Sequence, residues 1–306
     1  MPRPIFLNQQ NCYIYCVLHL QYIRSFHMDT RLLTIQDVSC VGQCSLTVAL
    51  PVISACGIET AILPSSVLST HTAGFSGYTF RDLTADMPAI LAHWKKEGIT
   101  FDAFYTGYVS KDQIPYILQI MNETARPGAV RIIDPVMADN GKMYPGFDAD
   151  FPKEMAKLCN GADVIMPNLT EAAFLLGQEP VLSGYDEAFI EDMLKKLHAL
   201  GARNVVLTGV SFSKDKLGSA CYDGRTITYD FNEWLPAAVH GTGDVYASSF
   251  AGAYVQGASI TEAAALAADF VIEAMKATLP DPDHTYGVKF EKALPFLIQE
   301  IGKLKK

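Results

Sequence analysis

The sequence lacks long runs of positive charge. Lys and Arg number 24 against 33 Asp and Glu, which gives a formal net charge of −9 at pH 7. The longest cluster of basic residues is at the C-terminus, in Lys303, Lys305 and Lys306. Because an acidic surface repels nucleic acid on average, we expect no nucleic-acid partner. A small anionic ligand is compatible with this charge, since backbone N–H groups can bind phosphate in an acidic protein.

Long apolar stretches are lacking near the N-terminus. The apolar patch at residues 13–20 is interrupted by His19 and is too short to span a bilayer. No small-residue cleavage site follows it, so we expect neither a membrane anchor nor a signal peptide. A clear strand pattern begins only after Met28. We therefore predict that residues 1–27 are a loosely attached extension and that residues 28–306 form the folded domain.

Metal-binding cysteine patterns are lacking as well. The seven cysteines include no CxxC pair, and the closest spacings, Cys12/Cys16 and Cys40/Cys44, have no accompanying His or Cys cluster for zinc. The odd count and the apolar surroundings indicate reduced thiols, which are typical of a cytoplasmic protein. A redox role for Cys40 and Cys44 is the alternative.

The chain does contain a regular alternation of short apolar runs and helical patterns from Met28 onward. Strands are expected at residues 31–35, 59–64, 103–106, 129–134, 162–166 and 204–208. Helices are expected from Thr170 and at residues 44–54, 86–97, 111–125, 185–200, 242–256, 259–277 and 288–303. This alternation implies parallel strands with right-handed crossovers, and a hairpin at Asp223-Gly224 adds an antiparallel pair. Without a linker-like stretch or an internal repeat, one α/β domain is predicted.

Residues 240–244 read His-Gly-Thr-Gly-Asp and lead directly into an apolar helical pattern. The glycines let the backbone approach a bound group, and successive N–H groups at a helix start form an anion site. Asp244 at this position can accept a proton from a hydroxyl group while the N–H groups stabilise a transferring phosphoryl group. The alternative is that Asp244 only caps the helix.

Asn168 and Glu171 follow a predicted strand and begin a predicted helix. Ligands of parallel sheets bind at the carboxyl ends of the strands, which favours a functional role for both residues. An amide oxygen and a carboxylate at this place can orient water around Mg²⁺ and its phosphates. A capping pair with a purely structural role is the alternative interpretation.

Asp134 and Asp139 lie in a loop after another predicted strand. Two acidic residues directly after a buried strand suit a site for phosphate and cations. An ordinary turn stabilised by Asp and Pro is equally compatible with this pattern.

The order of these three segments resembles the ribokinase-like superfamily, and further segments narrow the match to bacterial pyridoxal/pyridoxamine kinases. Those segments are residues 37–42, 45–51, 68–72, 105–108 and 134–141. The resemblance covers residues 32–277 and leaves residues 1–27 unmatched. It implies a ribokinase-like three-layer sandwich, with a mostly parallel central sheet between helices and little or no lid. It also implies ATP and Mg²⁺ as cofactors, K⁺ as a further candidate, a small-molecule substrate and a homodimer.

The resemblance also assigns expected roles to particular residues. Asp244 would be the general base toward the 5′-hydroxymethyl group, and the amides of Gly241, Thr242 and Gly243 would form the anion hole. Mg²⁺ would be held, largely through water, by Asn168, Glu171 and Asp134. The ATP side of the site would consist of Asp134, Asp139, Asn168 and Thr208. The pyridine ring or its substituents would contact Asp37, Thr72 and Tyr108.

Three positions depart from the family pattern. Asp37 stands where many relatives have serine, Ala138 replaces a common glycine, and Met166 occupies a position often held by threonine. The first bears on ring recognition, and the other two on the geometry of ATP and cations.

Two other functions are compatible with the same fold. Hydroxymethylpyrimidine (phosphate) kinase acts on a similar flat heteroaromatic alcohol, but its motif often reads GTGC, so Asp244 favours the vitamin B6 interpretation. A catalytically silent regulator is the second alternative, and the joint presence of Asp244, Asn168 and Glu171 argues against it. Sugar kinases of the ribose type are disfavoured, because the segment 64–86 is short for their lid.

Overall fold

The fold is organised around a mixed β-sheet. A computed structural model describes residues 30–72, 74–235, 240–281, 283–284 and 286–304. Residue contacts separate the chain into two units, Met1–Thr30 and Arg31–Lys306, and the second contains every element described below. The predicted extension at residues 1–27 lies outside the described residues.

The sheet has a parallel centre and antiparallel edges. Its strands are β1 (Arg31–Ser39), β2 (Glu59–Leu68), β3 (Phe80–Asp82), β4 (Phe101–Thr106), β5 (Ala125–Ile133), β8 (Val164–Ile165), β9 (Asn204–Val210), β10 (Lys216–Tyr222) and β11 (Ile227–Glu233). They lie in the order β11-β10-β9-β8-β5-β4-β1-β2-β3. The strands from β9 to β2 in this order run parallel, whereas β3, β10 and β11 pair antiparallel. A separate small hairpin consists of β6 (Ala138–Asp139) and β7 (Lys142–Met143).

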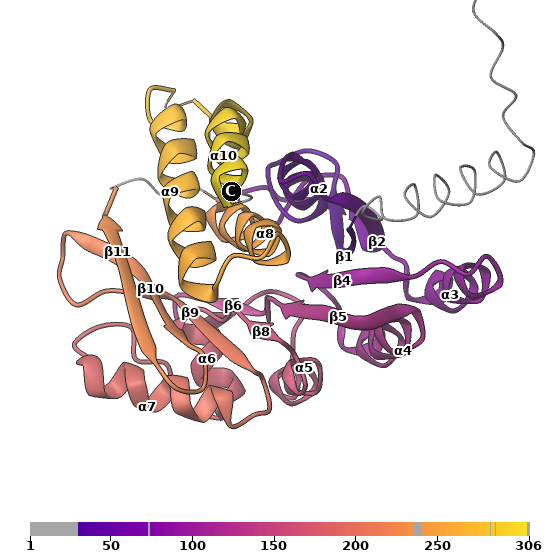
Figure 1. Cartoon of the computed structure of the whole chain (residues 1–306), viewed down its shortest axis with the longest axis horizontal. Helices are drawn as coiled ribbons and strands as arrows, with labels where there is room; N and C mark the ends of the chain where they lie inside the picture. Colours follow the sequence, from indigo (N-terminus) through magenta and orange to yellow (C-terminus); the bar gives the residue numbers. More distant parts are fainter. Residues whose placement is uncertain (1–29, 73, 236–239, 282, 285, 305–306) are drawn as a thin grey trace, which may run out of the picture. The chain divides into compact units, whose positions relative to one another are not determined.

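Helices cover both faces of the sheet, so the fold has three layers (Figure 1). One face packs against α2 (Leu46–Ala55), α8 (Thr242–Val255), α9 (Ile260–Thr278) and α10 (Phe290–Leu304). The other packs against α3 (Met87–Lys96), α4 (Ile114–Thr124), α5 (Phe151–Cys159), α6 (Leu169–Leu175) and α7 (Glu187–His198). The predicted ribokinase-like architecture is therefore confirmed. The only sheet element between β2 and α3 is the three-residue strand β3, which agrees with the expectation of little or no lid.

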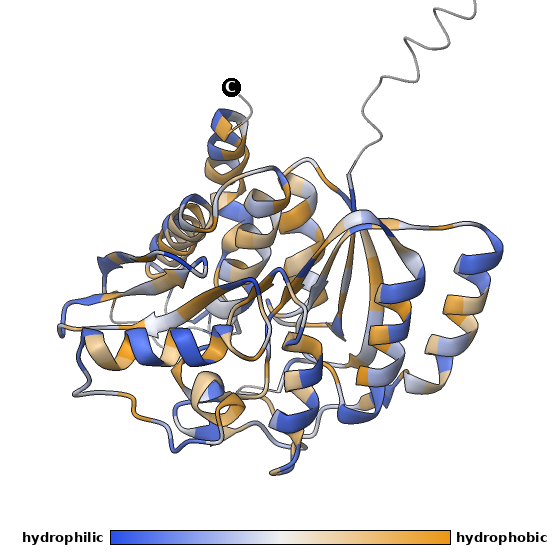
Figure 2. Ribbon diagram, turned by 60° about the horizontal axis from the view of Figure 1, so that its bottom comes forward, coloured by the Kyte–Doolittle hydropathy of each residue, from blue (hydrophilic) through white to orange (hydrophobic). Residues whose placement is uncertain are grey.

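The apolar pattern of the central strands explains this arrangement. Leu32 and Leu33 are neighbours in β1 and both are fully buried, Leu32 in the core beneath α2 and α8 and Leu33 in the core beneath α3 and α4. A strand with apolar side chains on both faces is stable only when both faces are covered. The covering helices alternate apolar and polar bands, as Figure 2 shows, so each packs one side inward and exposes the other to water.

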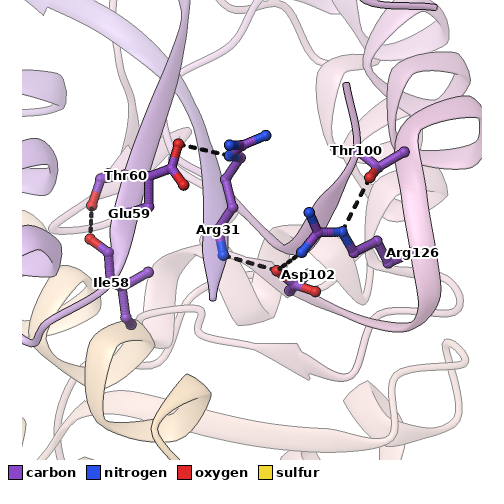
Figure 3. A network of polar contacts seen from close by, with 7 residues as sticks. All are labelled: Arg31, Ile58, Glu59, Thr60, Thr100, Asp102 and Arg126. Carbon is purple, nitrogen blue, oxygen red and sulfur yellow. Dashed lines mark hydrogen bonds and ion pairs between the residues drawn. The ribbon is translucent and has the colours of Figure 1, made fainter. Parts of the chain in front are cut away.

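Polar contacts join the amino ends of four strands, β1, β2, β4 and β5 (Figure 3). The carboxylate of Asp102, at the start of β4, accepts the backbone N–H of Arg31 at 2.8 Å and the guanidinium of Arg126 at 2.6 Å. Arg126 also donates to Thr100, and Arg31 donates to Glu59 at 2.8 Å. These bonds fix β1, β2, β4 and β5 at the sheet edge opposite their carboxyl ends, where the candidate site lies.

Several elements differ from the sequence-based expectation, among them the unexpected strand β3. Strand β2 continues to Leu68 because its last residues pair with β3, whereas it was expected to end at residue 64. The hairpin of β6 and β7 was not expected. Helix α5 was not expected either, although its buried residues Phe151, Met155 and Leu158 follow helical spacing. Helix α5 spans only nine residues, and Pro152 in its first turn gives the segment the look of a loop.

Cysteines and hydropathy add two observations. The described cysteines Cys40, Cys44, Cys159 and Cys221 are free thiols, Cys56 is buried in the core, and Cys12 and Cys16 lie outside the described residues. Within the described ranges, no helix combines the length and the apolar character that a membrane crossing requires.

Candidate active site

The candidate residues lie at the carboxyl edge of the parallel strands. Asp37 is near the end of β1, Asp134 follows β5, and Asn168 follows β8. Thr208 lies in β9 beside Asn168, to which it is joined by a parallel bridge. Because parallel strands end at a common edge, residues distant in sequence meet there.

The first turn of α8 presents backbone donors to this edge. Gly241 precedes the helix with φ 81° and ψ 0°, and the first bond of the helix runs from the N–H of Val245 to the Gly241 oxygen. The N–H groups of Thr242, Gly243 and Asp244 therefore have no partner within the helix and can bind an anion. Gly241, at the N-cap position, has no side chain that could cap α8.

Gly241 is required by its surroundings. A Cβ atom at this position would lie 2.0 Å from the carbonyl oxygen of Gln43. Its positive φ is also a conformation that other residues adopt only with strain. A Cβ at Gly243, by contrast, would meet no atom within 4 Å.

Asp244 is partly exposed. Neighbouring groups of Ser45 and Cys44, in the turn before α2, favour its charged form and so lower its pKa. Burial and the negative charge of Asp37 outweigh these groups and raise the pKa of Asp244 to about 7. A carboxylate with this pKa can accept a proton near neutral pH.

Asp37 lies almost completely buried beside this carboxylate, with 5% of its surface exposed. Its Oδ2 accepts a hydrogen bond from the Ser39 hydroxyl at 3.0 Å. Burial raises the pKa of Asp37, although Ser45 and Ser39 oppose the shift. Asp37 and Asp244 therefore form one electrostatically connected pair.

Asn168 and Glu171 form a capping box at the start of α6. The Asn168 side chain accepts the N–H groups of Thr170 at 2.8 Å and of Glu171 at 3.0 Å. Glu171 accepts the Asn168 N–H at 2.9 Å in return. Its other oxygen accepts the Met137 N–H at 3.1 Å, which ties α6 to the loop after β5. The structural alternative for this pair is thus present, together with a contact that links it to the loop of Asp134.

Two buried carboxylates lie in this part of the site. Asp134 is 9% exposed and Glu171 is 3% exposed. Burial, followed by the charges of Glu171 and Asp244, raises the pKa of Asp134 well above its usual range. Burial raises the pKa of Glu171 to about 8, although backbone N–H groups oppose the shift. Asp139 is exposed, and both of its oxygens accept hydrogen bonds from Asn140.

Two residues expected on the ring side, Tyr108 and Thr72, are not buried. Tyr108 is partly exposed, and its ring packs against Phe147 with centroids 5.2 Å apart. Burial and the charge of Asp37 raise the pKa of Tyr108, which places it within electrostatic reach of Asp37. Thr72 is exposed on the loop between β2 and β3. Among the residues predicted for the site, Thr72 is therefore the one for which the structure gives no such link.

The oxygen ligands fit a magnesium ion that is bound mainly through water and phosphate. In the described part of the chain, no group of three or more His, Cys, Asp and Glu side chains is placed to hold a metal ion directly. Mg²⁺ typically takes one or two carboxylates and keeps water or substrate phosphate as its other ligands. Asp134 and Glu171 supply that number of buried carboxylates.

Comparison with known proteins identifies the family. The model of the phosphomethylpyrimidine kinase family matches residues 52–288, more than half of the chain. This chain belongs to that family. The resemblance to bacterial pyridoxal kinases is also confirmed, because bacterial pyridoxine and pyridoxal kinases are among the proteins that match this chain. The chain is a kinase of the phosphomethylpyrimidine/pyridoxal kinase family.

Three relatives of this kinase illustrate the similarity. The crystal structure of pyridoxal kinase from Lactobacillus plantarum has a TM-score of 0.81 and 33% identity, covering 88% of this chain and 97% of that one. A provisionally assigned phosphomethylpyrimidine kinase from Bacteroides thetaiotaomicron, in a crystal form with pyridoxal, has a TM-score of 0.83 and 35% identity, with 88% and 96% covered. Pyridoxine kinase from Bacillus subtilis is 31% identical over 194 residues, which are 60% of this chain and 67% of that protein.

Sequence reasoning missed several residues that face the acidic groups of this kinase. Cys44 and Ser45 both lower the pKa of Asp244, and no pattern marks them as site residues, since they open the helix expected at residues 44–54. Tyr144 was also missed. Burial, followed by the charges of Glu171, Asp139, Asp244 and Asp134, raises its pKa. The structure also locates two of the residues that depart from the family pattern. Met166 is buried in an apolar core. The carbonyl oxygen of Ala138 accepts a hydrogen bond from the Asn168 side-chain amide at 2.8 Å.

Proposed function

We propose that this kinase transfers the γ-phosphoryl group of ATP to the 5′-hydroxymethyl group of a vitamin B6 compound, namely pyridoxal, pyridoxamine or pyridoxine. The observation that carries the proposal is the environment of Asp244. Asp244 lies in the first turn of α8, whose first N–H groups have no partner within the helix, and burial raises its pKa to about 7. The similarity to the Lactobacillus plantarum pyridoxal kinase supports the choice of acceptor.

In the proposed reaction, the alcohol oxygen of the acceptor attacks the γ-phosphorus atom of ATP. The bond between this phosphorus and the bridging oxygen breaks, and ADP leaves with that oxygen. Asp244 takes the proton of the alcohol, while the N–H groups of Thr242, Gly243 and Asp244 stabilise the charge on the transferring group. Asp37, Thr72 and Tyr108 are proposed to orient the ring.

The ATP side of the site is proposed to involve Asp134, Asp139, Asn168 and Thr208. Asp134 and Glu171, with Asn168, would hold Mg²⁺, largely through water. A bound ion would neutralise charge on the phosphates. Burial raises the pKa of both carboxylates, and a cation held between them would oppose this shift by favouring their charged form. K⁺ dependence and a homodimer, both expected from the resemblance, stay predictions.

Hydroxymethylpyrimidine (phosphate) kinase is the second candidate. The description of the matching family model favours it, since that model is named for phosphomethylpyrimidine kinase. The same base and the same anion site would serve this reaction. The two candidates therefore differ in the contacts to the ring, and Asp244 favours vitamin B6 because the rival motif often has cysteine there.

The test is a panel assay that measures ADP release with MgATP and each candidate alcohol. We expect turnover of at least one vitamin B6 compound at a higher kcat/KM than that of hydroxymethylpyrimidine or ribose. Asp244→Asn should lower kcat by about 10²- to 10⁴-fold while ligand binding, measured by calorimetry, is retained. Preference for hydroxymethylpyrimidine would refute the proposed acceptor. Bound ATP without turnover of any alcohol would favour the regulatory alternative, and near-normal kcat in Asp244→Asn would exclude Asp244 as the base.

A further inference from the structure

Gln43 lies in the turn between β1 and α2, and its carbonyl oxygen packs against Gly241. A Cβ atom at Gly241 would be 2.0 Å from this oxygen. Gly241 is the residue from which α8 begins, and the first N–H groups of that helix have no partner within it. The position of Gln43 therefore bears on the direction in which these N–H groups point.

The segment before α10 holds the backbone of Gln43. The Gln43 N–H donates to the carbonyl oxygen of Tyr286 at 3.1 Å, and the Nε2 of His71 donates to the same oxygen at 3.2 Å. Gly287 follows Tyr286 and approaches Gln43 so closely that an added Cβ would lie 2.5 Å from the Gln43 Cβ. The two segments are thus packed closely together, which leaves little freedom to the backbone of Gln43.

The side chain of Gln43 is bound at both ends of its amide. Its Nε2 donates to the Oε1 of Glu291 at 2.7 Å, and its Oε1 accepts a hydrogen bond from the Nε2 of His284 at 3.1 Å. Glutamine suits this place because its side chain carries both a donor group and an acceptor. Glu291 lies in the first turn of α10 and is exposed. An exposed residue near the C-terminus is thus connected through Gln43 to the turn beside Gly241.

The segment that binds Gln43 is itself fixed to the end of α9. The N–H of Lys289 donates to the Thr278 hydroxyl at 2.8 Å, and the Lys289 side chain forms an ion pair with Asp281. The N–H of Asp281 donates to the Thr278 carbonyl oxygen at 2.9 Å. The groups that bind Gln43 therefore have a defined position relative to α9 and α10.

We propose that Gln43 is a positioning residue for the anion site at the start of α8. Anchored by Glu291 and His284, it sets the place of Gly241 and thereby the direction of the first N–H groups of the helix. This proposal rests on the proposed function, which assigns those N–H groups to the transferring phosphoryl group. Gln43 touches neither ATP nor the acceptor, and it acts on the reaction through Gly241.

A positioning role predicts a loss of kcat without a loss of ATP binding. Backbone donors stabilise a transition state when they lie within about 3 Å of the atom on which charge develops. A small displacement of the first turn of α8 therefore weakens the transition state more than it weakens bound ATP. A purely structural role of Gln43 would instead lower the melting temperature and leave kcat unchanged at temperatures far below unfolding.

The first test measures kcat and KM with MgATP and the alcohol that the wild-type protein phosphorylates fastest. Gln43→Ala should lower kcat roughly three- to tenfold, with KM for MgATP within about twofold of wild type. Glu291→Ala should act in the same direction. Glu291→Gln keeps an acceptor for the Gln43 amide and should restore most of the kcat that Glu291→Ala loses. The double variant Gln43→Ala/Glu291→Ala should have the kcat of Gln43→Ala, because the second change removes a hydrogen bond that is already lost.

Gln119→Ala is the matched control. Gln119 donates to Glu123 at 2.8 Å in an exposed Gln–Glu pair of α4, which packs on the other face of the sheet. This variant should leave kcat unchanged. An unchanged kcat in Gln43→Ala, or an equal loss in Gln119→Ala, would overturn the positioning role. Losses that add up in the double variant would also overturn it, since the two residues would then act independently.

A binding measurement separates this proposal from the proposed function, because it needs no turnover. MgADP is titrated by calorimetry with and without aluminium fluoride, which takes the place of the transferring phosphoryl group. We expect aluminium fluoride to raise the affinity of the wild-type protein and this gain to fall roughly three- to tenfold in Gln43→Ala. If the wild-type protein phosphorylates no alcohol but shows the gain and its loss, the proposed function is refuted and the positioning role stands. An equal gain in Gln43→Ala would overturn the positioning role, and no gain in the wild-type protein would overturn the anion site on which it rests.

Discussion

The buried side chain of Asp37 lies within electrostatic reach of Asp244. The two acids come from β1 and α8, at opposite ends of the chain, and the charge of Asp37 adds to burial in raising the pKa of Asp244 to about 7. A residue that departs from the serine of many relatives is thus coupled to the proposed base.

Asp37→Asn removes this charge at nearly constant volume. The pKa of Asp244 should fall because a nearby negative charge no longer disfavours its ionised form. In the wild-type protein, kcat/KM is expected to rise with pH through about 7 as Asp244 loses its proton. In Asp37→Asn this limb should move to lower pH, measured as kcat/KM between pH 5 and 8. A limb that stays in place would contradict the coupling, and Asp163→Asn, at the amino end of the sheet, is the charge-matched control.

The buried carboxylate of Glu171 predicts that the protein without ligands loses stability as pH rises. The pKa of Glu171 is about 8 in the folded chain, against an ordinary value of 4.5 for a glutamate side chain. The folded state therefore binds the proton more tightly than the unfolded state. Its contribution to stability is fully present below pH 4.5 and is lost as pH rises through about 8. Asp244, with a pKa raised from 3.8 to about 7, acts in the same direction. Melting temperatures at pH 5, 6.5 and 8 should therefore decrease in this order.

MgATP provides the complementary measurement. A cation is bound by the deprotonated carboxylates, so the gain in melting temperature on adding MgATP should be larger at pH 8 than at pH 5. Glu171→Gln should flatten both pH trends. Equal gains at the two pH values in the wild-type protein would argue against Glu171 and Asp134 as the magnesium side of the site.

Gly241→Ala and Gly243→Ala should differ sharply although the two glycines share one loop. At Gly241 an added Cβ meets the Gln43 oxygen at 2.0 Å and the φ of 81° is strained. We expect the free energy of unfolding to fall by about 1–3 kcal/mol. At Gly243 the Cβ enters open space, and the free energy should stay within about 1 kcal/mol of wild type. Urea unfolding of both variants decides this, and similar losses in the two would show that the close approach at Gly241 is not what matters.

Removal of residues 1–27 should leave the melting temperature and kcat unchanged, since we propose that residues 28–306 fold without them. The first strand starts at Arg31, whose N–H is anchored to Asp102. A longer deletion that also removes residues 28–33 is the matched control, because Leu32 and Leu33 are fully buried. It should give an insoluble protein. Insolubility of the shorter deletion would disprove the proposed boundary.

Much of the fold was predictable because its signals are local. The apolar runs of β1, β4 and β9 and the capping pair of Asn168 and Glu171 are patterns within a few residues. The hairpin at Asp223-Gly224 is also local, and β10 and β11 pair around it. Helix α5 and strand β3 escaped prediction, the first because it is short and starts with Pro152, the second because its three residues form a strand only by pairing with β2.

The sequence by itself determined the order of strands and helices, hence a parallel sheet, and the residue types at its carboxyl edge. Those follow from periodicity and from motif spacing, which are properties of adjacent residues. The tertiary structure alone decided that Ser45 adopts a strained turn and that burial raises the pKa of Asp244, Asp134 and Glu171. The physical reason is that a pKa depends on the charges and solvent around a group in space, and segments far apart in the chain supply those charges.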